Sequence, residues 1–94
     1  MIETDGYICR KFIVKGKVQG VWFRVSTQRQ AQQLDITGYA KNLANGNVEV
    51  VACGSATAVE RLMQWCATGP ELAEVEALHE EVTEQQEFPG FATL

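Results

Sequence analysis

The spacing of the apolar residues switches between a two-residue period and a helical period along the chain, and each switch predicts a new element of secondary structure. The predicted elements, in chain order, are a strand at 8–15, a helix at 23–34, strands at 36–43 and 47–53, a helix at 55–69 and a strand at 74–83. This β-α-β-β-α-β order is typical of the ferredoxin-like fold. We therefore expect an α+β sandwich in which two helices cover one face of an antiparallel four-stranded sheet, with residues 91–94 as a short closing strand.

The boundaries of these elements follow from turn and capping residues. The Asn-Gly pair at 45–46 tolerates positive φ and predicts a tight hairpin turn between the second and third strands. Gly54 is expected to end the third strand, and either Ser55 or Thr57 to cap the second helix. Because the chain is short and has no low-complexity linker, residues 1–94 are expected to form a single domain.

The three cysteines form no CxxC pair, so a zinc site is not expected. In the predicted topology the first and third strands are antiparallel neighbours, which brings Cys9 and Cys53 near each other. If the register agrees, these two residues are a candidate disulfide. The alternative is that Cys9, Cys53 and Cys66 are all buried free thiols, which a cytosolic location favours.

Basic and acidic residues are concentrated in different parts of the chain. Seven of the eight Lys and Arg residues fall between residues 10 and 41, whereas residues 71 to 87 carry seven of the twelve acids. The acidic strand at 74–83 suits a sheet edge, where charge deters pairing with other molecules. The net charge of −4 argues against a dedicated nucleic-acid partner, although the basic first half would attract a small anion.

The sequence also bears on compartment and assembly. No stretch is apolar enough to span a membrane, and the opening MIETDGYICRK lacks the apolar core of a signal peptide. We therefore expect a cytoplasmic protein without a membrane partner. A monomer is the default for one small acidic domain.

Residues 16 to 24, GKVQGVWFR, join the first strand to the first helix and offer a site for an anion. Successive backbone N–H groups of such a loop can point to one place, where the helix N-terminus adds its own N–H groups and its positive dipole end. Gly16 and Gly20 would let the chain approach a ligand closely, and the guanidinium of Arg24 would bind two phosphate oxygens. The alternative is a plain turn with a surface arginine.

Six residues of this loop are expected to bind phosphate through their backbone N–H groups: Val18, Gln19, Gly20, Val21, Trp22 and Phe23. The side chains of Val18, Val21, Trp22 and Phe23 are expected to pack and so to keep the loop rigid. The loop would then present fixed donors to an anion.

Other kinds of phosphate site do not fit this chain. Gly20 is followed by Val21 rather than by Lys and Ser or Thr, which excludes a Walker A loop. No cysteine is followed six positions later by arginine, so the thiolate-phosphatase loop is missing. Asp5 and Asp35 form no aspartate cluster for magnesium, and the single histidine, His79, is expected to be exposed on the acidic strand. We therefore expect neither a metal nor a cofactor.

Two longer stretches resemble the acylphosphatase family. VKGKVQGVWFR at 14–24 matches the first signature of that family, and GYAKNLANGNVEVVACG at 38–54 matches its second. The Trp65–Pro70 stretch and the length of the chain are also similar to that family. The closing FATL at 91–94 differs, because it lacks the basic or aromatic ending of many members.

The resemblance implies an enzyme that hydrolyses carboxyl phosphate mixed anhydrides to a carboxylate and inorganic phosphate, without a metal or cofactor. Carried over by position, Arg24 would bind the phosphoryl group together with the loop N–H groups, and Asn42 would orient the attacking water. Two rival hypotheses are a non-catalytic anion-binding module on the same fold and an RNA-binding sheet. The third predicted strand, NVEVVAC, lacks the basic and aromatic residues that RNA recognition needs.

Overall fold

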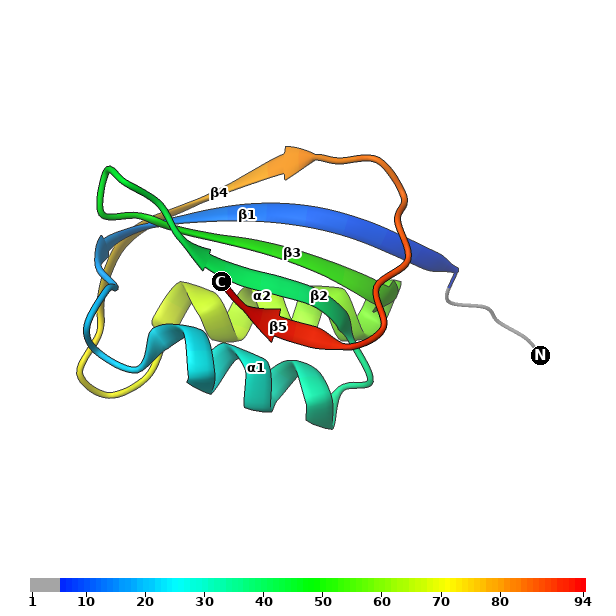
Figure 1. Ribbon diagram of the computed structural model, residues 1–94, viewed down its shortest axis with the longest axis horizontal. Helices are drawn as coiled ribbons and strands as arrows, with labels where there is room; N and C mark the ends of the chain where they lie inside the picture. Colours follow the sequence, from blue (N-terminus) through cyan, green and yellow to red (C-terminus); the bar gives the residue numbers. More distant parts are fainter. Residues whose placement is uncertain (1–5) are drawn as a thin grey trace.

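The computed structural model describes residues 6 to 94 and has the predicted order of elements. The elements are β1 (Tyr7–Lys17), α1 (Phe23–Gln33), β2 (Thr37–Asn42), β3 (Val48–Ser55), α2 (Ala56–Thr68), β4 (Glu74–Val82) and β5 (Phe91–Thr93). The five strands form one sheet in the order β4-β1-β3-β2-β5, and both helices lie on the same face of it (Figure 1). The predicted ferredoxin-like α+β fold is confirmed. Residues 1–5, which belong to the stretch searched for a signal peptide, lie outside the described residues.

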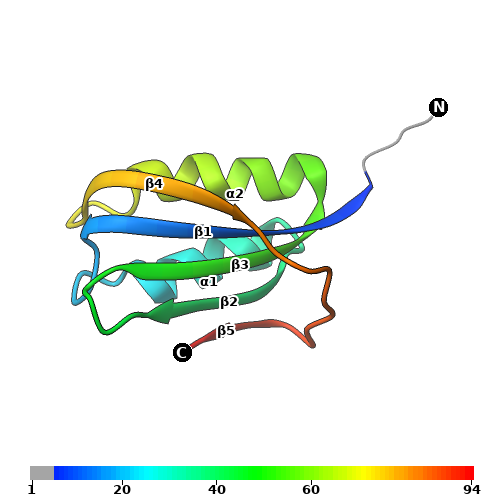
Figure 2. The ribbon, with the colours of Figure 1, turned by 90° about the horizontal axis from the view of Figure 1, so that it is seen from above.

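The closing strand makes the sheet mixed rather than purely antiparallel. β1 pairs with β3 and β4, and β3 pairs with β2, all in the antiparallel sense that the sequence predicts. β5 instead runs parallel to β2, with Gly38 opposite Phe91. The reason is the path of residues 83–90, which leave β4 where β1 begins and cross that end of the sheet to its far edge (Figure 2).

The main core lies between the sheet and the two helices. Alternate residues of β1 and β3 face the helices, and α2 supplies the opposite side of the layer. Fully buried members of this layer include Phe12, Val14, Val48, Val50, Leu62 and Cys66. Thr27 is the polar member, and its hydroxyl donates to the carbonyl of Phe23 at 2.7 Å, so its burial leaves no unpaired donor. Burying one side chain such as Leu62 stabilises the fold by roughly 1.5–3 kcal/mol.

The cysteines behave in two different ways. Cys9 and Cys53 face each other in the β1–β3 register and are joined by a disulfide, with an S–S distance of 2.05 Å and a Cα–Cα distance of 4.1 Å. Cys66 is a buried free thiol on α2. Burial raises the pKa of the Cys66 thiol to about 12, although a hydrogen bond with Thr27 acts in the opposite direction. The alternative that all three cysteines are free thiols is therefore wrong for Cys9 and Cys53 and holds for Cys66 alone.

A second, smaller cluster covers the disulfide on the face of the sheet away from the helices. Tyr39 and Phe88 pack against it, with their ring centroids 5.9 Å apart in an edge-to-face arrangement. The N–H of Gln86 donates to Sγ of Cys9 at 3.4 Å, and the hydroxyl of Tyr7 donates to the carbonyl of Gln86 at 2.9 Å. The crossing segment 83–90 is thus fixed to the start of β1.

The junction of β3 and α2 differs from the prediction in one respect. β3 does not stop before Gly54, because Gly54 pairs with Ile8 of β1 and the ladder continues to Ser55. Ser55 is the N-cap of α2, since its hydroxyl accepts a hydrogen bond from the N–H of Ala58 at 3.1 Å. The other candidate cap, Thr57, lies inside the helix.

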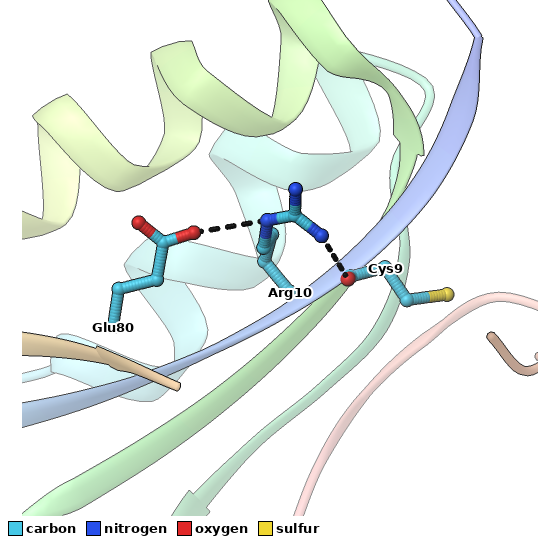
Figure 3. A network of polar contacts seen from close by, with 3 residues as sticks. All are labelled: Cys9, Arg10 and Glu80. Carbon is cyan, nitrogen blue, oxygen red and sulfur yellow. Dashed lines mark hydrogen bonds and ion pairs between the residues drawn. The ribbon is translucent and has the colours of Figure 1, made fainter. Parts of the chain in front are cut away.

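The acidic strand β4 is a sheet edge, as its glutamates predict. Beside it, Arg10 of β1 forms an ion pair with Glu80, with 3.0 Å between Nε and Oε2, and Nη1 of Arg10 donates to the carbonyl of Cys9 at 3.2 Å (Figure 3). The two side chains are 40% and 42% exposed, so solvent screens the pair and limits its contribution to about 1 kcal/mol. His79 is also exposed on β4, as expected.

Candidate active site

The loop between β1 and α1 is anchored by buried side chains. Val18, Val21 and Phe23 all enter the main core, as predicted. The prediction that Trp22 also packs there is wrong, because its side chain is 72% exposed. The left-handed backbone at Trp22, with φ 65° and ψ 20°, allows Val21 and Phe23 on either side to be buried together and leaves the indole outside.

The two glycines of this segment have different uses. Gly16 does not approach a ligand, because it lies inside β1, where a Cβ would overlap the carbonyl oxygen of Glu74 in β4. Gly20 has a φ of 74° and open space around the position of a Cβ. Positive φ at Gly20 and Trp22, but not at Val21, gives the alternation of backbone handedness that is typical of anion-binding loops.

The backbone donors of the loop are free of protein partners. Within residues 6–94, no backbone N–H from Val18 to Arg24 donates a hydrogen bond to another residue. The last of these belong to the first turn of α1, whose N–H groups have no acceptor within the helix. A row of N–H groups next to the positive end of the α1 dipole is therefore available to an anion.

The side chain of Gln19 fastens the loop to the turn between β2 and β3. Its Nε2 donates to the carbonyl of Leu43 at 2.8 Å and to that of Asn47 at 2.9 Å. The sequence predicts a phosphate-binding role for the backbone N–H of Gln19 but no role for its side chain. No local signal reveals these bonds, since the partners lie 24 and 28 residues away.

Arg24 and Asn42 lie in the same part of the molecule. β1 and β2 are both antiparallel to β3 and so run in the same direction, and Asn42 is the last residue of β2. Both strands consequently end at the edge where the loop and the start of α1 lie. A cavity of about 340 Å³ there is lined by Val18, Gly20, Trp22, Phe23, Arg24, Val25, Asn42 and Thr93.

The main-chain oxygen of Leu94 connects these two residues. Nη1 of Arg24 donates to it at 2.7 Å, and the backbone N–H of Asn42 donates to it at 3.2 Å. Neither of the ion pairs found in the described part of the chain involves Arg24. A guanidinium has five N–H donors, so most of those of Arg24 are left for a ligand. No local feature of the sequence predicts this contact of Leu94.

The amide of Asn42 has an unusual environment. Its Oδ1 is buried and has no hydrogen-bond partner among residues 6–94. A buried acceptor without a donor costs roughly 1–3 kcal/mol, so such an atom calls for a functional explanation. Asn42 also lines the cavity that the loop between β1 and α1 borders, so its unpaired amide oxygen lies close to the free N–H groups of that loop.

Other reactive chemistry is scarce around the cavity. No group of three or more His, Cys, Asp or Glu side chains that could hold a metal ion occurs in residues 6–94, and Asp5 lies outside that range. The free thiol of Cys66 is buried on α2 and is not part of the lining of the cavity. The described helices include none with the length and apolarity that crossing a bilayer requires.

Comparison with known proteins agrees with the geometry. A family model described as Acylphosphatase matches residues 10–93. The chain belongs to the acylphosphatase family. The acylphosphatase of Vibrio parahaemolyticus is 48% identical over 86 residues, which cover 92% of this chain and 96% of that protein. The acylphosphatase of Yersinia pseudotuberculosis is 56% identical over 80 residues, covering 84% and 87%. The structure of an acylphosphatase from Coxiella burnetii superposes with a TM-score of 0.89 at 38% identity, covering 94% of this chain and 93% of that one.

Proposed function

We propose that the chain is an acylphosphatase, which hydrolyses the carboxyl–phosphate bond of acyl phosphates to a carboxylate and inorganic phosphate. Membership of the acylphosphatase family supports this function. The structural observation that carries it is the meeting, around one cavity, of free loop N–H groups, the guanidinium of Arg24 and the unpaired Oδ1 of Asn42.

In this mechanism the phosphoryl group binds to the loop between β1 and α1. The N–H groups of Val18 to Phe23 and the guanidinium of Arg24 donate to its oxygens. A transferring phosphoryl group spreads charge over its equatorial oxygens, so donors fixed in advance stabilise the transition state. The hydrogen bond to the main-chain oxygen of Leu94 supports this role because it restrains the guanidinium at the cavity.

Asn42 would orient the attacking water. Its Oδ1 would accept a hydrogen bond from the water and direct the water oxygen toward phosphorus, opposite the leaving carboxylate. The hydrogen bond from the N–H of Asn42 to Leu94 ties the backbone of Asn42 to the same oxygen that holds Arg24. The position of the attacking water relative to the phosphoryl group would therefore depend on the two contacts with Leu94.

The leaving group explains why so little acid–base machinery is needed. A carboxylic acid has a pKa near ~4, so a carboxylate leaves without a proton from a general acid. The proton of the attacking water passes to the phosphoryl oxygens of the substrate itself. The rate should therefore vary little across neutral pH.

We further propose that the enzyme works without a metal or cofactor, as a single domain and a monomer in the cytoplasm. The first point is supported by the donors of the proposed site, which are backbone N–H groups and one guanidinium. Disulfides are rare in reducing compartments such as the cytoplasm. The oxidation state of Cys9 and Cys53 in intact cells therefore tests the proposed location.

The decisive experiment measures phosphate release from benzoyl phosphate in excess chelator. The wild-type chain should be active, and Asn42→Ala should lose turnover by about a hundredfold or more, the order expected for one positioning group, while it still binds inorganic phosphate. Arg24→Gln should lose both turnover and phosphate binding. Arg29→Gln, a change of an exposed arginine on the same helix, is the matched control and should behave as wild type.

The same experiment separates the enzyme from a non-catalytic anion-binding module. Such a module would bind phosphate but would release none from benzoyl phosphate. Full turnover in Asn42→Ala would assign that residue to structure and remove the proposed role of its amide.

A further inference from the structure

The side chain of Trp22 is large and apolar, yet most of it is exposed. The large apolar side chains exposed in the described part of the chain are Tyr7, Trp22, Leu72, Val82 and Leu94. A single exposed apolar side chain needs no explanation by itself. Trp22 differs from the others in this set because it lines the cavity that contains Arg24 and Asn42. With 72% of its surface in solvent, the indole lies at the rim of that cavity.

The backbone holds the indole in this place. Trp22 has φ 65° and ψ 20°, a left-handed conformation that bulky L-residues rarely adopt and that glycine adopts without strain. Burial of Val21 and Phe23 on either side fixes the strained residue between them. Strained non-glycine residues concentrate at functional sites, and here the strain presents an aromatic face beside the reacting groups.

We propose that Trp22 binds the acyl part of the substrate, so that the enzyme prefers acyl phosphates whose acyl group is uncharged and apolar, above all aromatic. This inference rests on the proposed function. The phosphoryl group uses the loop N–H groups and Arg24, and the lining that remains for the acyl group includes the apolar side chains of Trp22 and Val25. Acyl groups with an apolar surface are the ones that these side chains can desolvate favourably.

Size and charge narrow the substrate class further. The cavity of about 340 Å³ is comparable with ligand pockets, which span roughly 300–1,000 Å³, and a phosphoryl group alone is much smaller than the ligands of such pockets. Arg24 is the charged residue of the lining, and the phosphoryl group already uses it. An acyl group that carries its own carboxylate would find no second cation in the lining. Substrates such as benzoyl phosphate are therefore favoured over dicarboxylic acyl phosphates.

The expected effect is moderate. Aromatic pairs in offset or edge-to-face contact contribute enough to change a rate or binding constant by about three- to tenfold. Because Trp22 also belongs to the loop between β1 and α1 that is proposed to bind phosphate, substitutions at Trp22 change kcat/KM for all substrates by a common factor. The informative quantity is therefore the ratio of kcat/KM for benzoyl phosphate to kcat/KM for acetyl phosphate, in which the common effect cancels.

The test compares this ratio in the full chain and in two variants. Trp22→Gly removes the ring but suits the left-handed backbone, and it should lower the ratio about three- to tenfold. Trp22→Phe keeps an aromatic ring and should retain most of the preference. Val82→Ala, which shortens another exposed apolar side chain at the far end of β4, is the matched control and should leave the ratio unchanged.

Binding gives a second readout that does not depend on turnover. In a Trp65→Phe background, Trp22 is the sole tryptophan, so its fluorescence reports directly on the cavity rim. Benzoylphosphonate, a non-hydrolysable analogue, should change this emission saturably and bind about three- to tenfold more tightly than acetylphosphonate. For Trp22→Gly, which lacks the reporter indole, the affinity of each analogue is measured from its inhibition of substrate hydrolysis. The two analogues should then bind with the same affinity.

The outcomes separate this inference from the proposed function. Hydrolysis of both substrates with an unchanged ratio in Trp22→Gly would overturn the role of Trp22 and leave the acylphosphatase function intact. A wild-type chain that hydrolyses neither substrate would overturn both. A lowered ratio in Trp22→Gly that Trp22→Phe largely restores supports the inference.

Discussion

Reduction of the Cys9–Cys53 disulfide should lower the free energy of unfolding by about 4 kcal/mol. The two cysteines are 44 residues apart in sequence. In the chain-entropy model a loop of that length restricts the unfolded chain by about 13 cal/mol/K, which corresponds to about 4 kcal/mol at 25 °C. Domains of this kind have a total stability of roughly 5–15 kcal/mol, so the bridge would supply a large share of it.

The assay is urea unfolding of the same wild-type chain with and without a reductant, which avoids any change of side chain. With an m-value of ~1–3 kcal/mol/M, the midpoint should fall by roughly 1.3–4 M on reduction. The double variant Cys9→Ala/Cys53→Ala is the control, and its midpoint should not respond to the reductant. Thiol counting in denaturant should find one free thiol, Cys66, before reduction and three after it.

Two results would refute this reasoning. Three reactive thiols in the unreduced, denatured chain would mean that no bridge forms. If the bridge forms but its reduction leaves the urea midpoint unchanged, then the entropic restriction of the unfolded chain is cancelled by an equal destabilisation of the folded chain. Turnover of benzoyl phosphate should survive reduction while the chain stays folded, because Cys9 lies near the start of β1 and the phosphate loop follows its end.

The other predictions concern single contacts. Gln19→Leu removes both bonds to the β2–β3 turn and should lower turnover roughly tenfold or more with an unchanged circular dichroism spectrum; wild-type turnover would show that the bonds are dispensable. Gly16→Ala places a Cβ against the carbonyl of Glu74 at a φ of 127° and should cost about 2 kcal/mol or more in urea unfolding; a neutral effect would disprove the overlap. Folding raises the pKa of the Cys66 thiol from 9.0 to about 12, so its contribution to stability is complete below pH 9 and is lost as pH rises toward 12. Between these two pH values, the free energy of unfolding of Cys66→Ala should therefore fall less than that of wild type. Arg10→Gln should cost less than ~1 kcal/mol, and a larger loss would contradict solvent screening of the half-exposed ion pair.

Short-range sequence patterns predict most of the fold. The alternation of buried and exposed residues in β1, the Asn-Gly turn at 45–46 and the hydroxyl cap at Ser55 are all short-range signals, and each one predicted its element. The parallel arrangement of strands β1 and β2 then followed from the topology. This arrangement predicted that Asn42 and Arg24 would lie at one edge of the sheet, and both line the same cavity.

Most of the features that the sequence did not predict depend on distant residues. Gly54 continues β3 because Ile8 pairs with it, and the amide of Gln19 bonds carbonyls in another turn. Trp22 stands out of the core because its two neighbours enter it. The oxygen of Leu94 meets Arg24 across 70 positions. None of these contacts leaves a periodic trace in the sequence, so only the folded chain reveals them.

The shortest strand has a consequence for how the protein tolerates stress. β5 spans Phe91–Thr93 at the rim of the sheet, and β2 is its single strand neighbour. Brief stretches with few partners fray at free energies well below that of global melting. When β5 detaches, Phe91 leaves the core, and Arg24 and Asn42 lose their shared contact with Leu94 together, while the helices and the other strands stay packed. The temperature and denaturant limits of catalysis are then decided by a few residues at the periphery rather than by the bulk of the molecule.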